Sequence, residues 1–518
     1  MHMMSTFVTS LLVVCSILLI VFRPTRRQRI PYPPGPSSSP IIGNIFRVNL
    51  AQGAWKVFAQ MKEQYGDIIF LHGLGTTVLV LNSQKAVNDL LEKNGSSYSH
   101  RPVFTVAGEL MGLDQSLVLI PYGKEWREHR KLANIALSAV SVQKYRAIQE
   151  ELSALLNRDI LEKPDDFFMH VRLAAARVVM SVTYGFSVHD SDDKYITHAE
   201  KTMEIVTTAT VPGAFLCDLL PFMKHLPKWL PFMQTAAHGR NMVDTLVDRP
   251  FEQVKSELVS DQVSTGFLSI RTPSPVLQAS GTAADSLAKD LFSIVENNPE
   301  SEHRIKWILG TMYGAGGEAT YATVLTFIMA MALYPEKQMK AQQEIDSVVG
   351  TERMPTIADL PNLPYVKAVI KETMRWNPAF PLGVARRSSE DHVYEGYFIP
   401  KGTIVMPNIW AIASEPNPKY HSREFIPERF MDPLITTVDP SSYAFGFGRR
   451  YCPGRFLAEN SVSIMISTML AVFNISPSPN QKLEPDFSQN MISYPKPFNC
   501  KIAPRSENSA KLILQRTD

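Results

Sequence analysis

The chain has 518 residues, of which 45% are apolar and 20% are charged, and its formal net charge is +2. This composition excludes a disordered tail protein, a collagen-like repeat and a disulfide-stapled small domain, and it argues against general nucleic-acid binding. The four cysteines form no C-x-x-C pair, so they predict neither a disulfide framework nor a zinc site. The 37 prolines outnumber the 26 glycines, which predicts many helices joined by stiff loops.

The N-terminal end carries a candidate membrane anchor. Residues 3–22 contain no charge, and Arg23, Arg26, Arg27 and Arg29 follow at once. Twenty helical residues span about 30 Å, enough for a bilayer core. A cleaved signal peptide would carry its positive charge before the apolar run. We therefore expect an uncleaved, single-pass anchor with the rest of the chain in the cytosol. Residues 23–40 then form a basic and proline-rich hinge.

Two regions show the pattern of β-structure. Residues 68–71 and 77–81 are apolar runs around Gly73 and Gly75, which predicts a hairpin. Residues 393–399 and 403–405 flank Pro400-Lys401-Gly402, which predicts two strands joined by a turn. No repeat of 20–50 residues is visible, so a solenoid is not expected.

The rest of the chain has mainly helical character. Residues 299–334 contain no proline after Pro299, and Pro335 ends the run, which predicts a helix of about 50 Å. Further helices are expected over residues 335–349 and 364–376. Residues 212–231 are apolar but broken by prolines. Two interpretations stay open for them, contact with the bilayer and burial between helices. Residues 266–280 are interpreted as a surface loop or an insertion.

The most specific chemical signal is the segment 445–454, with the sequence FGFGRRYCPG. A helix-forming sequence starts at Arg455, so Cys452 would sit at the positive end of a helix, which favours the thiolate. Gly448 and Gly454 would allow tight turns, and Arg450 adds positive charge. One thiolate without a second soft ligand suits haem iron better than zinc. The alternative is a buried structural cysteine.

This segment resembles the cysteine loop of the cytochrome P450 monooxygenases, and the resemblance extends from the anchor to the C-terminal strands. It implies a mainly α fold with a small β region over residues 41–518, preceded by one transmembrane helix, and haem b as the cofactor. By resemblance, Cys452 is the axial ligand of the haem, Phe445 covers the sulfur and Arg450 pairs with a haem propionate.

Two further motifs match this family. Glu372 and Arg375 share one helix face and can pair, and the resemblance adds Arg429 as the third member of a structural lock. Trp126 and Arg130 lie four residues apart, and by resemblance both reach the haem propionates. Arg386 is a similar candidate.

The middle of the long helix reads AGGEAT over residues 315–320. The family places an acid and then an alcohol here, and these groups deliver protons during oxygen activation. Glu318 fits the acid. Ala319 occupies the alcohol position, and Thr320 is rotated by about 100° round the helix. Thr320, a water or a substrate hydroxyl would then have to replace this alcohol in proton delivery, unless the enzyme couples its use of electrons poorly to substrate oxidation.

The predicted function is hydroxylation or oxidation of an apolar small molecule, with O2 and with electrons from a separate NADPH–P450 reductase. Cytochrome b5 is a further candidate partner, and the endoplasmic reticulum membrane is the expected location. The pattern is most similar to fungal P450s of secondary metabolism, which implies terpenoid or polyketide substrates. By analogy, residues 104–119, 312–316, 380–384 and 491–493 line the substrate pocket.

Two alternatives remain. Ala319 motivates a P450-fold isomerase, dehydratase or peroxide-using enzyme that needs no oxygen activation. A non-enzymatic haem-binding protein is the other.

Overall fold

The computed structural model describes residues 30–39, 43–45, 53–188, 193–211, 214–265, 285–295, 298–479 and 482–517. The anchor expected over residues 3–22, the first part of the hinge and the segment 266–280 lie outside these residues. In the described part of the chain, one helix, Pro299–Leu333, is long and apolar enough to cross a membrane, but 67% of its apolar window is buried within the molecule.

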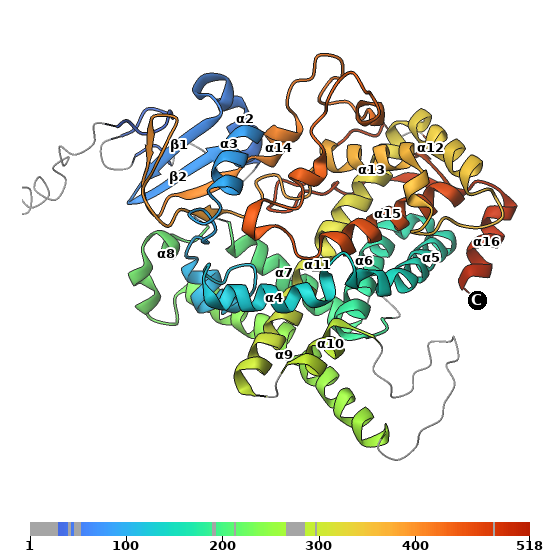
Figure 1. The fold of residues 1–518 in the computed structure, drawn as a ribbon, viewed down its shortest axis with the longest axis horizontal. Coiled ribbons are helices and arrows are strands. Elements are labelled where there is room, and N and C mark those ends of the chain that lie inside the picture. The colour runs from blue at the N-terminus through green and yellow to red at the C-terminus, as the bar shows by residue number, and fades with distance from the viewer. Residues whose placement is uncertain are drawn as a thin grey trace, which may run out of the picture.

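Helices form most of the molecule (Figure 1). Their bounds are α2 Ala54–Tyr65, α3 Gln84–Val87, α4 Lys124–Leu137, α5 Arg146–Glu162, α6 Phe167–Tyr184, α7 Lys194–Ala209, α8 Leu216–Leu219, α9 Pro231–Thr265, α10 Leu287–Ile294, α11 Pro299–Leu333, α12 Pro335–Val348, α13 Pro364–Trp376, α14 Ile409–Ala413, α15 Arg455–Val472 and α16 Glu507–Thr517. The mainly α fold with a small β region is therefore confirmed.

The strands gather mainly in one sheet beside the helices (Figure 1). It contains β1 Ile68–Gly73, β2 Thr76–Leu81, β6 Ile404–Pro407 and β3 Arg386–Arg387, in the order β1-β2-β6-β3. β1 and β2 are antiparallel, with Ile68 opposite Leu81, which confirms the predicted hairpin. β2 runs parallel to β6, with Val78 opposite Ile404.

The prediction for residues 393–405 is right about the turn at residues 400–402 but wrong about residues 393–399, which form two strands and not one. β4 His392–Tyr394 and β5 Tyr397–Ile399 form a hairpin of their own, because Glu395 and Gly396 both adopt positive φ, 50° and 80°. Such values suit a tight two-residue hairpin turn. β6 turns away from them and joins β2 and β3 instead. A third hairpin pairs β7 Phe473–Pro477 with β8 Cys500–Pro504.

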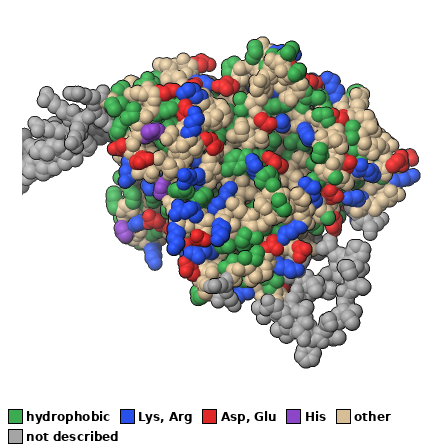
Figure 2. All heavy atoms as spheres, in the orientation of Figure 1, with side chains coloured by type: hydrophobic (Ala, Val, Ile, Leu, Met, Phe, Trp, Pro, Cys, Tyr) green, Lys and Arg blue, Asp and Glu red, His purple; other side chains and the backbone are tan. Residues whose placement is uncertain are grey.

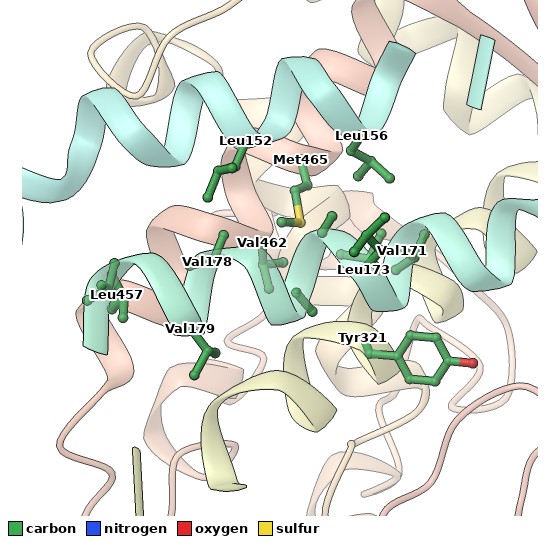
Figure 3. Packing of buried hydrophobic residues seen from close by; sticks show 14 of the residues in the cluster. Leu152, Leu156, Val171, Leu173, Val178, Val179, Tyr321, Leu457, Val462 and Met465 are labelled. Carbon is green, nitrogen blue, oxygen red and sulfur yellow. The ribbon is translucent and has the colours of Figure 1, made fainter. Parts of the chain in front are cut away.

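The core lies where α5, α6, α11 and α15 meet (Figure 3). α11 begins at Pro299 because the Asn298 side chain accepts a hydrogen bond of 2.9 Å from the N–H of Ser301, and it ends before Pro335. Most residues from Thr320 to Ala332 are fully buried. Such an all-round apolar helix belongs in the interior of a large domain.

The proline-rich hinge packs against the sheet where the structure describes it. The carbonyl of Pro34 accepts a hydrogen bond of 2.7 Å from the N–H of Phe70, and the carbonyl of Pro31 accepts one of 2.8 Å from Phe398. The ring of Tyr32 stacks on Phe70 with centroids 5.0 Å apart. Residues 31–34 are therefore fastened to β1 and β5.

The apolar segment around α8 is largely exposed. It forms α8 and a short 3-10 helix, Pro221–His225. Cys217 is buried, but the exposed fractions of Leu216, Phe222 and Trp229 are 52%, 66% and 71%. Burial between helices, one of the two interpretations of this segment, does not describe these three side chains.

Candidate functional site

The segment 445–454 forms a tight loop before α15. The N–H of Cys452 donates a hydrogen bond of 2.9 Å to the carbonyl of Phe445. Gly448 has a φ of +50°, and a Cβ there would lie 2.2 Å from the carbonyl oxygen of Leu91, so no larger residue fits. Gly454 also lies in a turn before α15, but its conformation does not require glycine. Its φ is −86°, and a Cβ there would meet nothing nearer than Met312, at 3.9 Å.

The surroundings of Cys452 act on its thiol in opposite directions. Burial raises the pKa of the Cys452 thiol, whereas the N–H of Gly454 and the positive charges of Arg130 and Arg455 lower it. Arg450, which we expected to contribute here, instead donates to the carbonyls of residues 99, 117 and 120. Burial prevails, so a cation must displace the proton before this sulfur acts as a thiolate ligand.

Three buried arginines lie close to this loop without a carboxylate partner. Arg101, Arg386 and Arg450 have exposed fractions of 8%, 3% and 8%. Within the described part of the chain they donate to backbone carbonyls, and Nη1 of Arg386 has no partner. Burial and their mutual repulsion lower the pKa of Arg450 to about 9, and burial lowers that of Arg386 to about 10. Buried, unbalanced positive charge is costly, so this cluster fits an anionic group.

Trp126 and Arg130 complete this side of the site from α4. The guanidinium of Arg450 lies 4.9 Å above the ring of the buried Trp126. Nη1 of Arg130 donates a hydrogen bond of 2.5 Å to the carbonyl of Tyr451, next to Cys452. The ring of Phe445 lies 6.4 Å from that of Tyr451. α4 therefore connects the cysteine loop to the arginine cluster.

The structure also brings Glu372, Arg375 and Arg429 together. Nε and Nη2 of Arg375 lie 2.6 and 2.8 Å from the two Glu372 oxygens, and Nε of Arg429 lies 3.0 Å from Oε2. The N–H of Ile426 adds a hydrogen bond of 2.7 Å to Oε1. The exposed fractions of the three charged side chains are 0%, 3% and 2%. A buried carboxylate with all these donors is a satisfied structural network.

Two of the four glycines of α11, Gly310 and Gly316, allow close helix packing. A Cβ on Gly310 would lie 2.8 Å from the side chain of Val247 in α9, and one on Gly316 would lie 2.8 Å from Val179 in α6. Helix crossings this close require glycine. Neighbouring helices therefore approach the α11 backbone closely at these two positions.

Glu318 and Thr320 face different surroundings. Glu318 lines the large cavity of the molecule, and burial raises the pKa of its carboxyl, while Arg172 lowers it. Thr320 is buried, and its hydroxyl lies 3.5 Å from the carbonyl of Gly316 in the preceding turn. It is not among the residues that line the cavity. The structure brings only the acid of the predicted pair to the cavity wall.

This cavity has a volume of about 1250 Å³. All four segments predicted to line the pocket contribute to it, through residues such as Phe104, Ala315, Phe380 and Met491. Its walls are mainly apolar, and its polar part lies along α6 and α7. The sequence analysis missed the contributions of α7, α9 and the β1-β2-β6-β3 sheet. The volume exceeds the range of about 300–1,000 Å³ that is typical of ligand pockets, so a bulky ligand fits.

Arg101 was not among the site residues predicted from the sequence. Its Nε donates a hydrogen bond of 2.8 Å to the carbonyl of Val118, and its Nη1 donates to those of Val384 and Ala385. The only local signal is an arginine followed by proline beside an apolar stretch, and this signal is common. The contacts that give Arg101 its place come from residues far away in the sequence.

Comparisons with known proteins agree with this geometry. The family model "Cytochrome P450" matches residues 33–502. The chain is a cytochrome P450. It is 37% identical over 511 residues to cytochrome P450 monooxygenase 58 of Postia placenta, covering 96% of this chain and 93% of that protein. It is 38% identical over 495 residues to cytochrome P450 monooxygenase COX2 of Coprinopsis cinerea, covering 93% and 90%.

A solved structure shares the fold. The zebrafish cytochrome P450 in complex with abiraterone aligns with a TM-score of 0.69 at 22% identity, covering 87% of this chain and all of that one. Membership of the P450 monooxygenases makes this chain a haem enzyme. Family membership therefore favours an enzyme over the alternative of a non-enzymatic haem-binding protein. The family also implies a redox partner and a small-molecule substrate.

Proposed function

We propose that this P450 oxidises a bulky apolar small molecule, with O2 and with electrons from NADPH–P450 reductase. The observation that carries the proposal is the arrangement of the cysteine loop, the unbalanced arginine cluster and the large cavity around one helix, α11. The proposed substrate class is a terpenoid or polyketide scaffold, which rests on the resemblance of the sequence to fungal P450s of secondary metabolism.

Cys452 would hold the haem iron through its sulfur. Arg101, Arg386 and Arg450 would bind the two propionates, with Trp126 and Arg130 beside them. The haem, when bound, supplies the activation of oxygen for insertion into a C–H bond. Nη1 of Arg386 is buried without a partner, which supports a place for an anionic group there. Phe445 would shield the sulfur from water.

The remaining chemistry belongs to side chains of the cavity. Its apolar walls bind the substrate and exclude water. Glu318 lies at the cavity wall, and its raised pKa keeps its carboxyl able to hold a proton closer to neutral pH. General acids work best when their pKa lies near the working pH. Glu318 is therefore the proposed proton donor, with Thr320 as a secondary candidate.

The electron donor would dock on the face that carries α4. Figure 2 shows several Lys and Arg side chains gathered there. Arg127 and Arg449, both exposed, lie 6.0 and 5.4 Å from the ring of Tyr122, and the exposed Lys131 lies one turn along α4. Arg130 of the same helix contacts the cysteine loop. A positive surface this close to Cys452 supports an acidic reductase, and cytochrome b5 as a second partner.

We also propose that the P450 is anchored in the endoplasmic reticulum membrane through residues 3–22, with residues 41–518 as its cytosolic catalytic domain. The exposed Phe222 and Trp229 support contact of this domain with the bilayer. Leu74, at the tip of the β1-β2 hairpin, is 40% exposed and has a φ of 47°. In Figure 1, this hairpin and α8 lie on the same side of the molecule. An exposed leucine side chain suits an apolar environment better than water.

Membrane contact is tested with the full chain in vesicles whose acyl chains carry bromine. The bromine should quench part of the tryptophan fluorescence, and Trp229→Phe should remove that part. The matched control is Trp410→Phe, since Trp410 is buried. Equal quenching in the Trp229 variant and the parent contradicts the contact.

The reaction is tested by co-expression with reductase in a host that is fed terpenoid and polyketide scaffolds, with products read by mass spectrometry. Oxygenated products that require NADPH and reductase support the proposal. Ala319 and the buried hydroxyl of Thr320 favour a second candidate, an isomerase, dehydratase or peroxide-using enzyme. Turnover in the absence of both NADPH and reductase decides for that second candidate.

A further inference from the structure

A group of charged side chains lies at the polar part of the large cavity. Arg172 of α6, Glu200 of α7 and Glu318 of α11 all line this cavity. α6 and α11 each contribute one of these charged side chains, whereas α7 contributes Lys201 and Glu204 as well as Glu200. A positive charge between two carboxylates acts on both of them. None of these residues other than Glu318 belongs to a motif of the sequence analysis.

Arg172 is held in a defined position. Its Nη1 lies 3.5 Å from Oε1 of Glu200, and its guanidinium lies 4.5 Å from the centre of the Tyr321 ring. Tyr321 is buried and packs against Tyr494 with ring centroids 5.7 Å apart. Figure 3 shows Tyr321 extending from α11, with its hydroxyl directed away from the packed leucines and valines. The aromatic ring therefore serves as a platform for the guanidinium.

Tyr321 also connects Arg172 with the catalytic acid. Glu318 and Tyr321 are three residues apart on α11 and share one face of that helix. The charge of Arg172 reaches Glu318 and lowers the pKa of its carboxyl, whereas burial and the charge of Glu200 raise that pKa. These are the charged groups that α6 and α7 present to Glu318, and Tyr321 is the titratable neighbour on its own helix.

We infer that Arg172 is a positioning residue for Glu318: seated on the ring of Tyr321, which shares a face of α11 with Glu318, and paired with Glu200, it places a positive charge on the cavity wall that Glu318 also lines. The inference rests on the proposed function, in which Glu318 donates protons. A proton donor must be reprotonated after each proton transfer. Because Arg172 and Glu200 act on Glu318 in opposite directions, the pair sets the pH at which Glu318 is half-protonated.

The first test measures the protonation of Glu318 directly in the full-length holoenzyme. Infrared difference spectra recorded against pH report the band of a protonated carboxyl, and Glu318→Gln identifies that band by its loss. Arg172→Gln should move the titration of this band upward by about one pH unit, and Glu200→Gln should move it downward. Arg172→Lys keeps the positive charge and should restore most of the parent titration. Lys201→Gln, which removes a positive charge beside Glu200 on the same wall, is the matched control and should leave the titration in place.

The second test follows the fate of the electrons. With reductase and NADPH alone, the peroxide released per NADPH oxidised is recorded against pH. This profile should move in the same direction as the infrared titration in Arg172→Gln and in Glu200→Gln. A titration that does not move in Arg172→Gln, or moves the same way in both variants, overturns the inference. If the reduced carbon monoxide complex of the parent protein showed no thiolate-type spectrum, this would instead refute the proposed function.

Discussion

The lock formed by Glu372, Arg375 and Arg429 allows a quantitative prediction. In Glu372→Gln the amide keeps one acceptor oxygen, but its NH2 group takes the place of Oε2, which lies 2.6 Å from Nε of Arg375 and 3.0 Å from Nε of Arg429. Donors then face donors, and two buried guanidiniums lose the carboxylate that balances them. Removing one partner of a buried ion pair costs about 3–5 kcal/mol, which is a large share of the usual stability of about 5–15 kcal/mol.

The assay is urea unfolding of the holoenzyme, followed by tryptophan fluorescence. With an m-value of about 3 kcal/mol/M, the midpoint should fall by about 1 to 1.7 M. The matched control is Glu162→Gln, which removes the partner of Arg158 at 3.0 Å, where the side chains are 56% and 38% exposed. Exposed pairs contribute about 0–1 kcal/mol, so this midpoint should barely move. Equal shifts in the two variants would refute the reasoning from burial.

Three other substitutions test separate parts of the molecule. Cys452→Ala should abolish the thiolate-type spectrum of the reduced carbon monoxide complex and all turnover. The control Cys500→Ala, which changes a buried cysteine of β8, should keep both. A normal spectrum in Cys452→Ala would show that Cys452 is not the ligand. Ala319→Thr should lower the peroxide released per NADPH, because it restores an alcohol next to Glu318; unchanged release in a peroxide assay argues against impaired proton delivery. Burial alone would raise the pKa of Glu428, but bonds from two lysines of α12 outweigh it and lower the pKa to about 2. Its ionised form therefore adds stability above its unfolded pKa, by about 3 kcal/mol, and this is lost as the pH falls from about 4.5 to about 2. Glu428→Gln should flatten the stability curve of the parent in that range, and parallel curves would contradict the shift.

Local sequence signals predicted the parts of this molecule that depend on neighbours in the chain. The prolines at 299 and 335 bound α11 because proline suits a first helical turn and cannot continue a helix. The spacing of Glu372 and Arg375 places them on one helix face, and the structure brings them into contact. The glycines around residue 74 allow the β1-β2 turn. Each of these features is decided within a few residues.

The remainder depends on contacts between distant segments. Arg101 has its role only because residues 118, 384 and 385 present their carbonyls to it. Gly316 leaves room for the side chain of Val179 in α6, which packs closely against it. Strand β6 follows the β4-β5 hairpin in sequence but pairs with β2. No local periodicity carries such information, so neither the partner of β6 nor the role of Arg101 could be predicted from the sequence.

The parallel pairing of β2 with β6 has a consequence for biosynthesis. On the ribosome, β2 emerges long before Ile404, so the β1-β2 hairpin waits with one unpaired edge while residues 82–403 are made. Contacts of such long sequence separation form late, and unpaired strand edges invite association with other chains. The sheet beside the cavity should thus be among the last parts of the nascent protein to close, and chaperones would have their longest opportunity to act on that edge.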